Sequence, residues 1–286
     1  AKHNKRRLGV HDGVTFVGLL EGVDVVSYLV GNAQLIAARI EQATSIDELA
    51  ITAQAIADQV QHLRRQGVKT EVVAEIVSDL NRHMLSRLFG LVAPAQLRDK
   101  ACLIVMGSEG RGEQTARTDQ DNGLILAEPV EADVLDSFRA AFSGALERFG
   151  FPPCPGNVMV INPLWSRTAS DYKADFRRWI ALPDADSHMN VAIFLDAVAV
   201  AGRSDLLDEV KSQLVALVRG EPVYLAHFAK AIDLFPTPIG FFNNIITKDG
   251  DGDAVDLKKG GIFPIVHGVR SLALEKGIIA ETRTDA

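Results

Sequence analysis

The fold is decided by one stretch, ACLIVMGSEGRGEQTARTDQDNGLILA, which covers residues 101–127. Its two ends, 101–106 and 122–127, are short apolar runs of the kind that form buried strands. Between them lies a loop, 107–121, that holds three glycines and charges of both signs. The stretch therefore predicts two strands of a small α/β core, joined by a loop whose polar groups are candidates for chemistry.

The loop combines a Gly-Ser pair with two aspartates. Gly107 and Ser108 follow the first strand directly, where a glycine lets the backbone approach a ligand and N–H and hydroxyl groups can donate to an anion. If Asp119 opens the second strand, Asp119 and Asp121 share one face of it. Two carboxylates suit Mg²⁺, which keeps further positions for water and phosphate. The pattern predicts a metal-nucleotide site; the alternative is a polar hairpin loop with solvated charges, because aspartates are common turn formers.

Helical patterns precede this stretch. Ser45 begins SIDE, a capping-box sequence, so we expect a helix from there to Gly67. Thr70 is expected to cap a second helix, whose apolar residues recur at helical spacing. The two helices are expected to pack as an antiparallel pair, with the apolar stripe in the core rather than on a partner-binding face.

Further elements are expected after the stretch. A helix is predicted over 131–149, then a turn-rich connector, FPPCPG, and a third strand at 158–161. Helical patterns return from Asp171 onward and include the apolar run NVAIFLDAVAVAG, and a last helix is expected over 261–276. Residues 240–257 have hairpin character around DGDGD; a calcium loop is excluded there because Ala254 and Gly260 replace the required glycine and glutamate.

Composition excludes several classes of function. The net charge of -7 and the isoelectric point near 5.5 give no basic surface for a nucleic-acid backbone. No apolar run approaches the length of a membrane span, and a cytoplasmic protein is expected. Cys102 and Cys154 are far apart and lack metal-type spacing, so neither a disulfide framework nor a zinc site is predicted, and Cys102 is expected in the core.

The order strand, Gly-Ser, D-x-D, strand resembles the signature of the nucleotidyltransferase superfamily that includes DNA polymerase beta and kanamycin nucleotidyltransferase. The longer sequence GSEGRGEQTARTDQDNGLIL is more similar to the N-terminal domain of PII-protein uridylyltransferase and to bacterial nucleotidyltransferases commonly fused to CBS and cyclic-nucleotide-binding modules. The resemblance implies an α+β fold: a small mixed-sheet nucleotidyltransferase domain flanked by an N-terminal helical linker and a C-terminal helical domain.

Other segments extend the resemblance along the chain. Residues 7–29 resemble the last strand pair and helix of a CBS motif, so the chain is expected to be part of a longer protein. DLKKGGI (256–262) resembles a stretch of the PII uridylyltransferases. The expected domains are a CBS remnant, a helical linker, the nucleotidyltransferase domain and the C-terminal helical domain, at 1–30, 31–95, 96–168 and 169–286.

The resemblance also implies roles for particular residues. Gly107 and Ser108 would hold the nucleoside triphosphate, and Asp119 and Asp121 would be the catalytic carboxylates that bind Mg²⁺ or Mn²⁺. The metal positions an acceptor hydroxyl for attack on the α-phosphorus.

Basic residues complete the expected nucleotide site. Arg111 and Arg117 are inferred phosphate partners because a guanidinium offers a fork of donors; the alternative is that they balance acids such as Glu109. Lys258 would reach a phosphate from the helical domain, or is simply solvated.

Active members of the superfamily carry a third carboxylate on a later strand, where this sequence has Asn162. Asp171 or Asp196 is a candidate for the missing charge, and Asp196 is equally a candidate for a buried ion pair with Arg203 or another base.

Two functions are therefore expected. One is transfer of a nucleoside monophosphate to a hydroxyl of a PII-like protein or a small molecule, in signal transduction. The other is regulatory nucleotide binding without turnover. A helical part that forms a homodimer is compatible with both.

Overall fold

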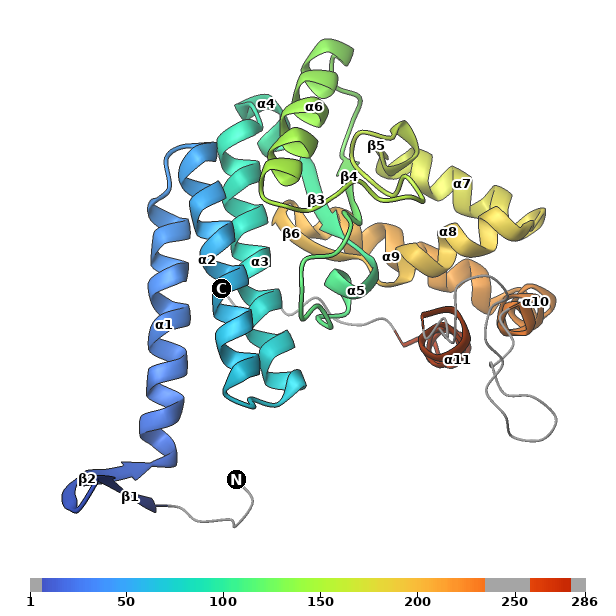
Figure 1. Ribbon diagram of the computed structural model, residues 1–286. Coiled ribbons are helices and arrows are strands. Elements are labelled where there is room, and N and C mark those ends of the chain that lie inside the picture. Colours follow the sequence, from blue (N-terminus) through green and yellow to red (C-terminus); the bar gives the residue numbers. More distant parts are fainter. Residues whose placement is uncertain (1–6, 235–257, 279–286) are drawn as a thin grey trace, which may run out of the picture. The chain divides into compact units, whose positions relative to one another are not determined.

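The computed structural model describes residues 7–234 and 258–278 (Figure 1). Contacts divide the chain into two compact units: unit 1 comprises 1–93, 112–120 and 137–157, and unit 2 comprises the remainder. The hairpin expected at 240–257 lies outside the described residues. Among the described helices, none combines the length and apolar composition needed to cross a membrane.

Unit 1 is an antiparallel hairpin followed by helices (Figure 1). The strands and helices are β1 (Arg7–Asp12), β2 (Thr15–Glu21), α1 (Gly22–Gln42), α2 (Ile46–Arg65), α3 (Thr70–Val92) and most of α6 (Ala132–Arg148). The strand pair and helix expected at the beginning of the chain are thus observed.

The N-termini of α2 and α3 are capped differently. Ser45 is the N-cap of α2 and accepts from the backbone N–H of Glu48 at 3.2 Å, as the sequence predicts. The Glu48 carboxylate accepts from the backbone N–H of Thr44 at 2.6 Å. The predicted cap of α3 is wrong, because Lys69 is its N-cap, without a side-chain hydrogen bond, and Thr70 is its first helical residue.

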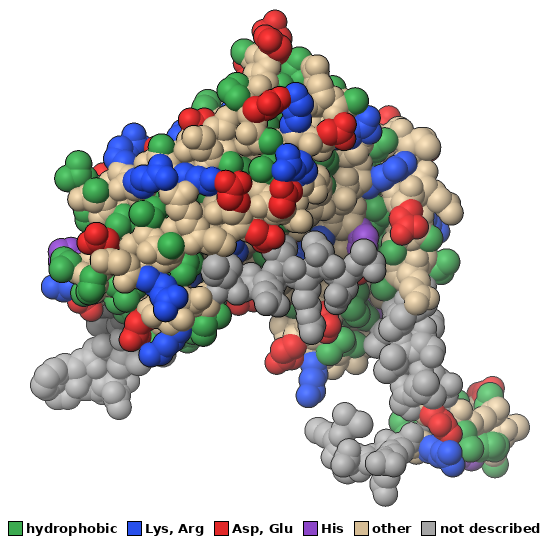
Figure 2. Space-filling view, turned by 180° about the vertical axis from the view of Figure 1, so that it is seen from behind, with side chains coloured by type: hydrophobic (Ala, Val, Ile, Leu, Met, Phe, Trp, Pro, Cys, Tyr) green, Lys and Arg blue, Asp and Glu red, His purple; other side chains and the backbone are tan. Residues whose placement is uncertain are grey.

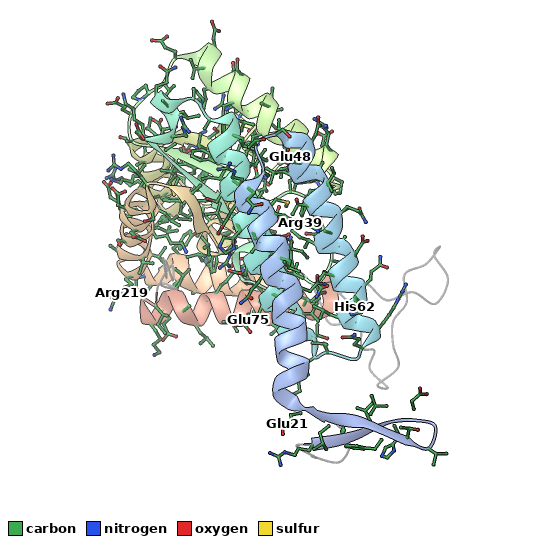
Figure 3. The ribbon with its side chains drawn as sticks, turned by 90° about the vertical axis from the view of Figure 1, so that its left-hand side faces the viewer. Glu21, Arg39, Glu48, His62, Glu75 and Arg219 are labelled. Atoms are coloured by element: carbon green, nitrogen blue, oxygen red, sulfur yellow. The ribbon has the colours of Figure 1, made fainter. Side chains whose placement is uncertain are left out.

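Helices α2 and α3 run antiparallel and pack together, as expected (Figure 1). Val60 and Leu63 of α2 share a buried cluster with Val73 and Val77 of α3. Figure 3 shows this part of unit 1 with Glu48 near the beginning of α2 and His62 near its end. The stripe on α3 is therefore core, and α6 adds Phe138, whose ring lies edge-on to Phe89 at 5.6 Å.

Unit 2 is built on a mixed four-stranded sheet in the order β5-β4-β3-β6. Strand β3 pairs antiparallel with both β4 and β6, whereas β4 and β5 are parallel. The strands are β3 (Ala101–Val105), β4 (Asn122–Leu126), β5 (Ser166–Thr168) and β6 (Val198–Gly202). The two strands predicted from the opening stretch are thus confirmed, and both are fully buried.

Two predictions around this sheet are wrong. Residues 158–161 form no strand. The Val158 carbonyl accepts from the backbone N–H of Asn122, and the N–H of Val160 donates to the side-chain Oδ1 of Asn122. The chain then turns into a 3₁₀ helix, η1 (Pro163–Trp165), because Pro163 cannot donate to a ladder. The run NVAIFLDAVAVAG is not one helix, since its second half is β6. Small and β-branched residues in that half pair with β3 instead.

The remaining helices of unit 2 come before, between and after the strands in the sequence. Helix α9 packs on β3 and β6, and α7 packs on α9 and β5. Their bounds are α4 (Ala95–Arg98), α5 (Gly107–Gly110), α7 (Ala169–Ala181), α8 (Ala185–Leu195), α9 (Ser204–Arg219), α10 (Pro222–Lys230), η2 (Ala231–Leu234), η3 (Lys258–Ile262) and α11 (Phe263–Lys276). The fold is mixed α+β with helical flanks, as the resemblance implies.

Candidate functional site

Gly107 lies at the point where β3 ends and the loop begins. Its φ of +59° is left-handed, a conformation that favours glycine. A Cβ added at this position would collide with the carboxylate of Asp121. The backbone N–H of Met106 donates to the Asp121 carbonyl at 2.9 Å, so the two ends of the loop meet here. The glycine therefore allows a carboxylate to lie against the backbone of the Gly-Ser turn.

The two aspartates precede β4 rather than standing on it, because the strand begins at Asn122. The expectation that Asp119 and Asp121 share one face of a strand is thus wrong. The two carboxylates still lie close together, and Gln120 between them is held by hydrogen bonds. Its buried side chain donates to the carbonyl of Phe151 at 3.1 Å, and its backbone N–H donates to Pro152 at 3.0 Å. These bonds fix the residue between Asp119 and Asp121.

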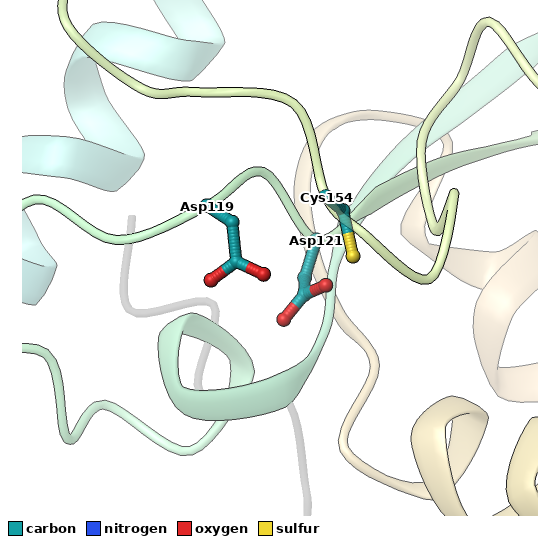
Figure 4. Close-up of side chains that lie close together, drawn as sticks. All are labelled: Asp119, Asp121 and Cys154. Carbon is teal, nitrogen blue, oxygen red and sulfur yellow. The ribbon is translucent and has the colours of Figure 1, made fainter. Parts of the chain in front are cut away.

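The side chains of Asp119, Asp121 and Cys154 lie close together (Figure 4). One ligand atom from each lies within 4.8 Å of the other two, and all three residues are half-buried. Two carboxylates so close fit a hard divalent cation. Among the described residues, the third ligand in this group is a thiol rather than a carboxylate. The sequence did not indicate Cys154, because only the folded connector brings it near the aspartates.

A second charged cluster lies in unit 2. The buried carboxylate of Asp196, at the end of α8, accepts from Arg111 Nη1 and from Arg270 Nε and Nη2. The alternative that Asp196 is a buried carboxylate in an ion pair is confirmed, but its partners are Arg111 and Arg270. Arg203 binds Asp205 instead. Burial lowers the pKa of the nearby Lys211 to about 8, although the charge of Asp196 acts in the opposite direction.

Arg117 is held in unit 1. Its guanidinium donates to the carbonyl of Ala53 at 2.6 Å and to the side chain of Gln54 at 3.2 Å, both on α2. Gly150, with a φ of +87°, leaves room for it, since a Cβ there would lie 2.7 Å from Arg117 Nη1. These contacts attach the loop to α2.

The other residues singled out from the sequence lie in helices, at helix caps or in the core. Ser108 is half-buried in α5. Asn162 caps η1 by accepting from Leu164 N–H at 3.0 Å, and Asp171 forms a capping box with Thr168 at the beginning of α7. Lys258 begins η3, and its side chain lies outside the described part of the chain. Cys102 is fully buried in β3, as expected, and burial raises the pKa of its thiol to about 12.

Two family models match the chain. Residues 54–186 match the model described as "Putative nucleotidyltransferase DUF294", which covers the loop and both aspartates. Residues 222–286 match "Putative nucleotidyltransferase substrate binding domain". Both matches support a nucleotidyltransferase family for this chain. A comparison with curated proteins gives no match.

One face of the described structure carries charges of both signs. Basic and acidic side chains are interspersed on the face shown in Figure 2, without a stripe of one sign.

Proposed function

We propose that the protein transfers a nucleoside monophosphate from a nucleoside triphosphate to a hydroxyl acceptor, with Mg²⁺ or Mn²⁺ held by Asp119 and Asp121. The observation that carries this proposal is the packing of the Asp121 carboxylate against Gly107, next to Asp119 and within the region that the family model matches. The two carboxylates provide negative charge for a cation, and the Gly-Ser turn provides donors for phosphate oxygens.

The residues have separable tasks in this proposal. A bound divalent cation supplies charge neutralisation at the phosphate oxygens. Asp119 and Asp121 hold that cation, and Gln120 keeps them in place through its bonds to the connector. Gly107 and Ser108 bind the triphosphate, since they form the turn that contacts Asp121. Lys258 remains the expected phosphate ligand from the helical part.

The finer proposal concerns the acceptor and the setting. We infer a protein hydroxyl of the PII type or a small-molecule hydroxyl as acceptor, in cytoplasmic signal transduction, as the resemblance to uridylyltransferases implies. The substrate-binding region at 222–286 would hold the acceptor. The hairpin and α1 are the proposed CBS remnant, and the domain borders near residues 30, 95 and 168 belong to the same proposal.

A second function is regulatory nucleotide binding without turnover. It is favoured by the absence of a third acid in the metal group of the described residues, where Cys154 lies instead. Asn162 is occupied in capping η1, and an amide cannot take a proton at neutral pH. A homodimer is compatible with both functions.

The test is label transfer from each of the four nucleoside triphosphates, in the presence of Mg²⁺ and cell extract. Transferase function predicts a labelled acceptor and release of pyrophosphate, both lost in Asp121→Asn and kept in Asp205→Asn, an exposed acid of α9. Label that persists in Asp121→Asn would remove the assignment of this site. Nucleotide binding without pyrophosphate release would favour the regulatory function.

A further inference from the structure

A small cavity lies in unit 2 between α8, η2 and α11. It measures about 40 Å³. One water molecule needs roughly 10–15 Å³, so the cavity admits a larger group. Among the described residues, no Asp, Glu, Lys or Arg lines it; its wall includes Ala185, His188, Met189, Ala231, Phe263 and His267. The cavity therefore suits an uncharged group.

A wider groove adjoins this cavity. It measures about 440 Å³ and shares Ala185, His188 and Ala231 with the cavity wall. The side chains that belong to the groove and not to the cavity are polar or charged: Asp184, His227, Lys230 and Asp233. Cavity and groove together suit a ligand with an uncharged end and a polar end.

His267 of α11 is a buried part of the cavity wall, with an exposed fraction of 1%. Its Nε2 lies 2.6 Å from the Phe228 carbonyl oxygen, which can only accept, so Nε2 carries the proton. Burial lowers the pKa of His267, so the ring is neutral at pH 7 and Nδ1 is an acceptor. Among the described residues, no donor reaches this buried Nδ1. An unpaired buried acceptor is costly, and a ligand with an N–H group would remove that cost.

Aromatic rings surround this acceptor. The rings of Phe263 and His267 are stacked, with centroids 5.3 Å apart and planes 9° apart, and the Phe228 ring packs on His267 at 4.5 Å. Tyr224 packs on His188 at 5.1 Å. His188 Nε2 and the Tyr224 hydroxyl are also buried, and neither has a hydrogen-bond partner in the described part of the chain. Aromatic walls with a few unpaired polar atoms favour a planar ligand that has hydrogen-bonding groups on its edge.

We propose that the cavity binds the base of a nucleoside and that the groove holds its ribose. A nucleobase is flat and uncharged, and its edge carries N–H donors beside acceptors, so it can donate to His267 Nδ1. Ribose hydroxyls suit the carboxylates of Asp184 and Asp233 in the groove. The inference rests on the proposed function, because it names the part of the nucleotide that the region matched as a substrate-binding domain recognises.

The experiment is calorimetric titration of the full chain with adenosine, guanosine, cytidine and uridine, without Mg²⁺. The wild type is expected to bind at least one of them. Ala185→Leu puts a larger side chain in the wall that cavity and groove share, and should weaken binding at least tenfold. His267→Gln keeps a donor for the Phe228 carbonyl but loses the ring acceptor, and should weaken binding about tenfold, as for one lost hydrogen bond.

Matched controls are an exposed alanine of α9 and an exposed histidine of α3, neither of which lines the cavity. Ala216→Leu and His83→Gln should bind the nucleoside as the wild type does. In NMR spectra, the Nδ1 resonance of His267 should shift when the nucleoside is added, because Nδ1 then accepts a hydrogen bond. A histidine with only a structural role would show no such shift.

Competition identifies the source of the base. If the cavity holds the base of the triphosphate substrate, the triphosphate of the same base with Mg²⁺ displaces the nucleoside. If the nucleoside is a separate ligand, it stays bound. Either result supports a base-binding cavity.

The outcomes separate this inference from the proposed function. If no nucleoside binds, or if Ala185→Leu and Ala216→Leu bind equally well, the inference is overturned, and label transfer from the triphosphates still decides the proposed function. If nucleosides bind through the cavity but no triphosphate releases pyrophosphate, the inference stands and regulatory binding is favoured. Should His267→Gln fail to fold by circular dichroism, the comparison of Ala185→Leu with Ala216→Leu decides.

Discussion

Two aspartates of unit 2, Asp196 and Asp175, each lie buried between two arginines, yet their surroundings differ. The partners of Asp196 are 22% and 12% exposed, and Lys211 adds a third cation. The partners of Asp175, Arg167 and Arg178, are 25% and 64% exposed, so water screens that cluster more. The same arrangement of charges is therefore more shielded from water beside the Gly-Ser turn than on α7.

The largest expected effect is on stability. Asp196→Asn leaves buried cations without their carboxylate and is expected to lower the free energy of unfolding by about 3–5 kcal/mol. Asp175→Asn should cost less, because Arg178 remains solvated. Urea denaturation of the two variants measures the difference. Equal losses would show that the two clusters are energetically alike.

Lys211 is a further difference between the two clusters. It lies near Asp196, whereas the described ion pairs of Asp175 involve two arginines, Arg167 and Arg178. The folded-state pKa of Lys211, about 8, lies below that of a free lysine, so the unfolded chain takes up a proton first as the pH falls. The free energy of unfolding should therefore rise by about 3 kcal/mol between pH 8 and pH 10.5. Denaturation at both pH values tests this, and Lys211→Met should remove the rise. An identical pH dependence in Lys211→Met contradicts the assignment.

Gly110→Ala is expected to disturb the Asp196 cluster and not the Asp175 cluster. The added methyl group must displace the Asp196 carbonyl, and the expected cost is about 1–3 kcal/mol, as for overpacking. The matched control is Gly144→Ala on α6, where a Cβ meets open space and helix propensity improves. Thermal unfolding should rank Gly144→Ala above the wild type and Gly110→Ala below it. The reverse order would show that the turn and Asp196 are not in contact.

The smallest expected effect is the titration of His267, a buried histidine of α11. Burial lowers its pKa, and the charge of Arg270 lowers it further, while a hydrogen bond to the Phe228 carbonyl opposes both. Arg270→Gln should therefore raise the pKa of His267, and the loss of stability on acidification below about pH 6.5 should become smaller. NMR titration of the imidazole measures this shift. Arg178→Gln should leave it unchanged, and an equal shift in both variants would show that Arg270 does not act on His267.

The sequence predicted the parts of the fold that depend on local pattern. The strands around residues 101–127, the Ser45 cap and the helix over 132–148 follow from periodicity and capping. Strand β6 was missed because its small apolar residues also suit a helix, and only pairing with β3 decides between the two. The strand predicted at 158–161 is absent because the chain turns there into η1, where Pro163 cannot donate to a ladder.

The candidate site was predicted less completely. Asp119, Asp121 and Gly107 were recognised from their spacing, although the constraint that the structure shows at Gly107 is the carboxylate of Asp121. Cys154 and Arg270 were not indicated, because contacts across long stretches of chain bring them to their neighbours. Arg111 was a candidate phosphate ligand and Asp196 a candidate for a buried ion pair, but the sequence did not indicate that the two residues pair with each other.

The most direct measurement of the central claim is binding of Mn²⁺ in the presence of a nucleoside triphosphate, followed by electron paramagnetic resonance of the free ion. If Asp119 and Asp121 hold the metal, the wild type binds Mn²⁺, Asp119→Asn/Asp121→Asn loses that binding, and Asp171→Asn retains it. Unchanged Mn²⁺ binding in the double variant would contradict the account.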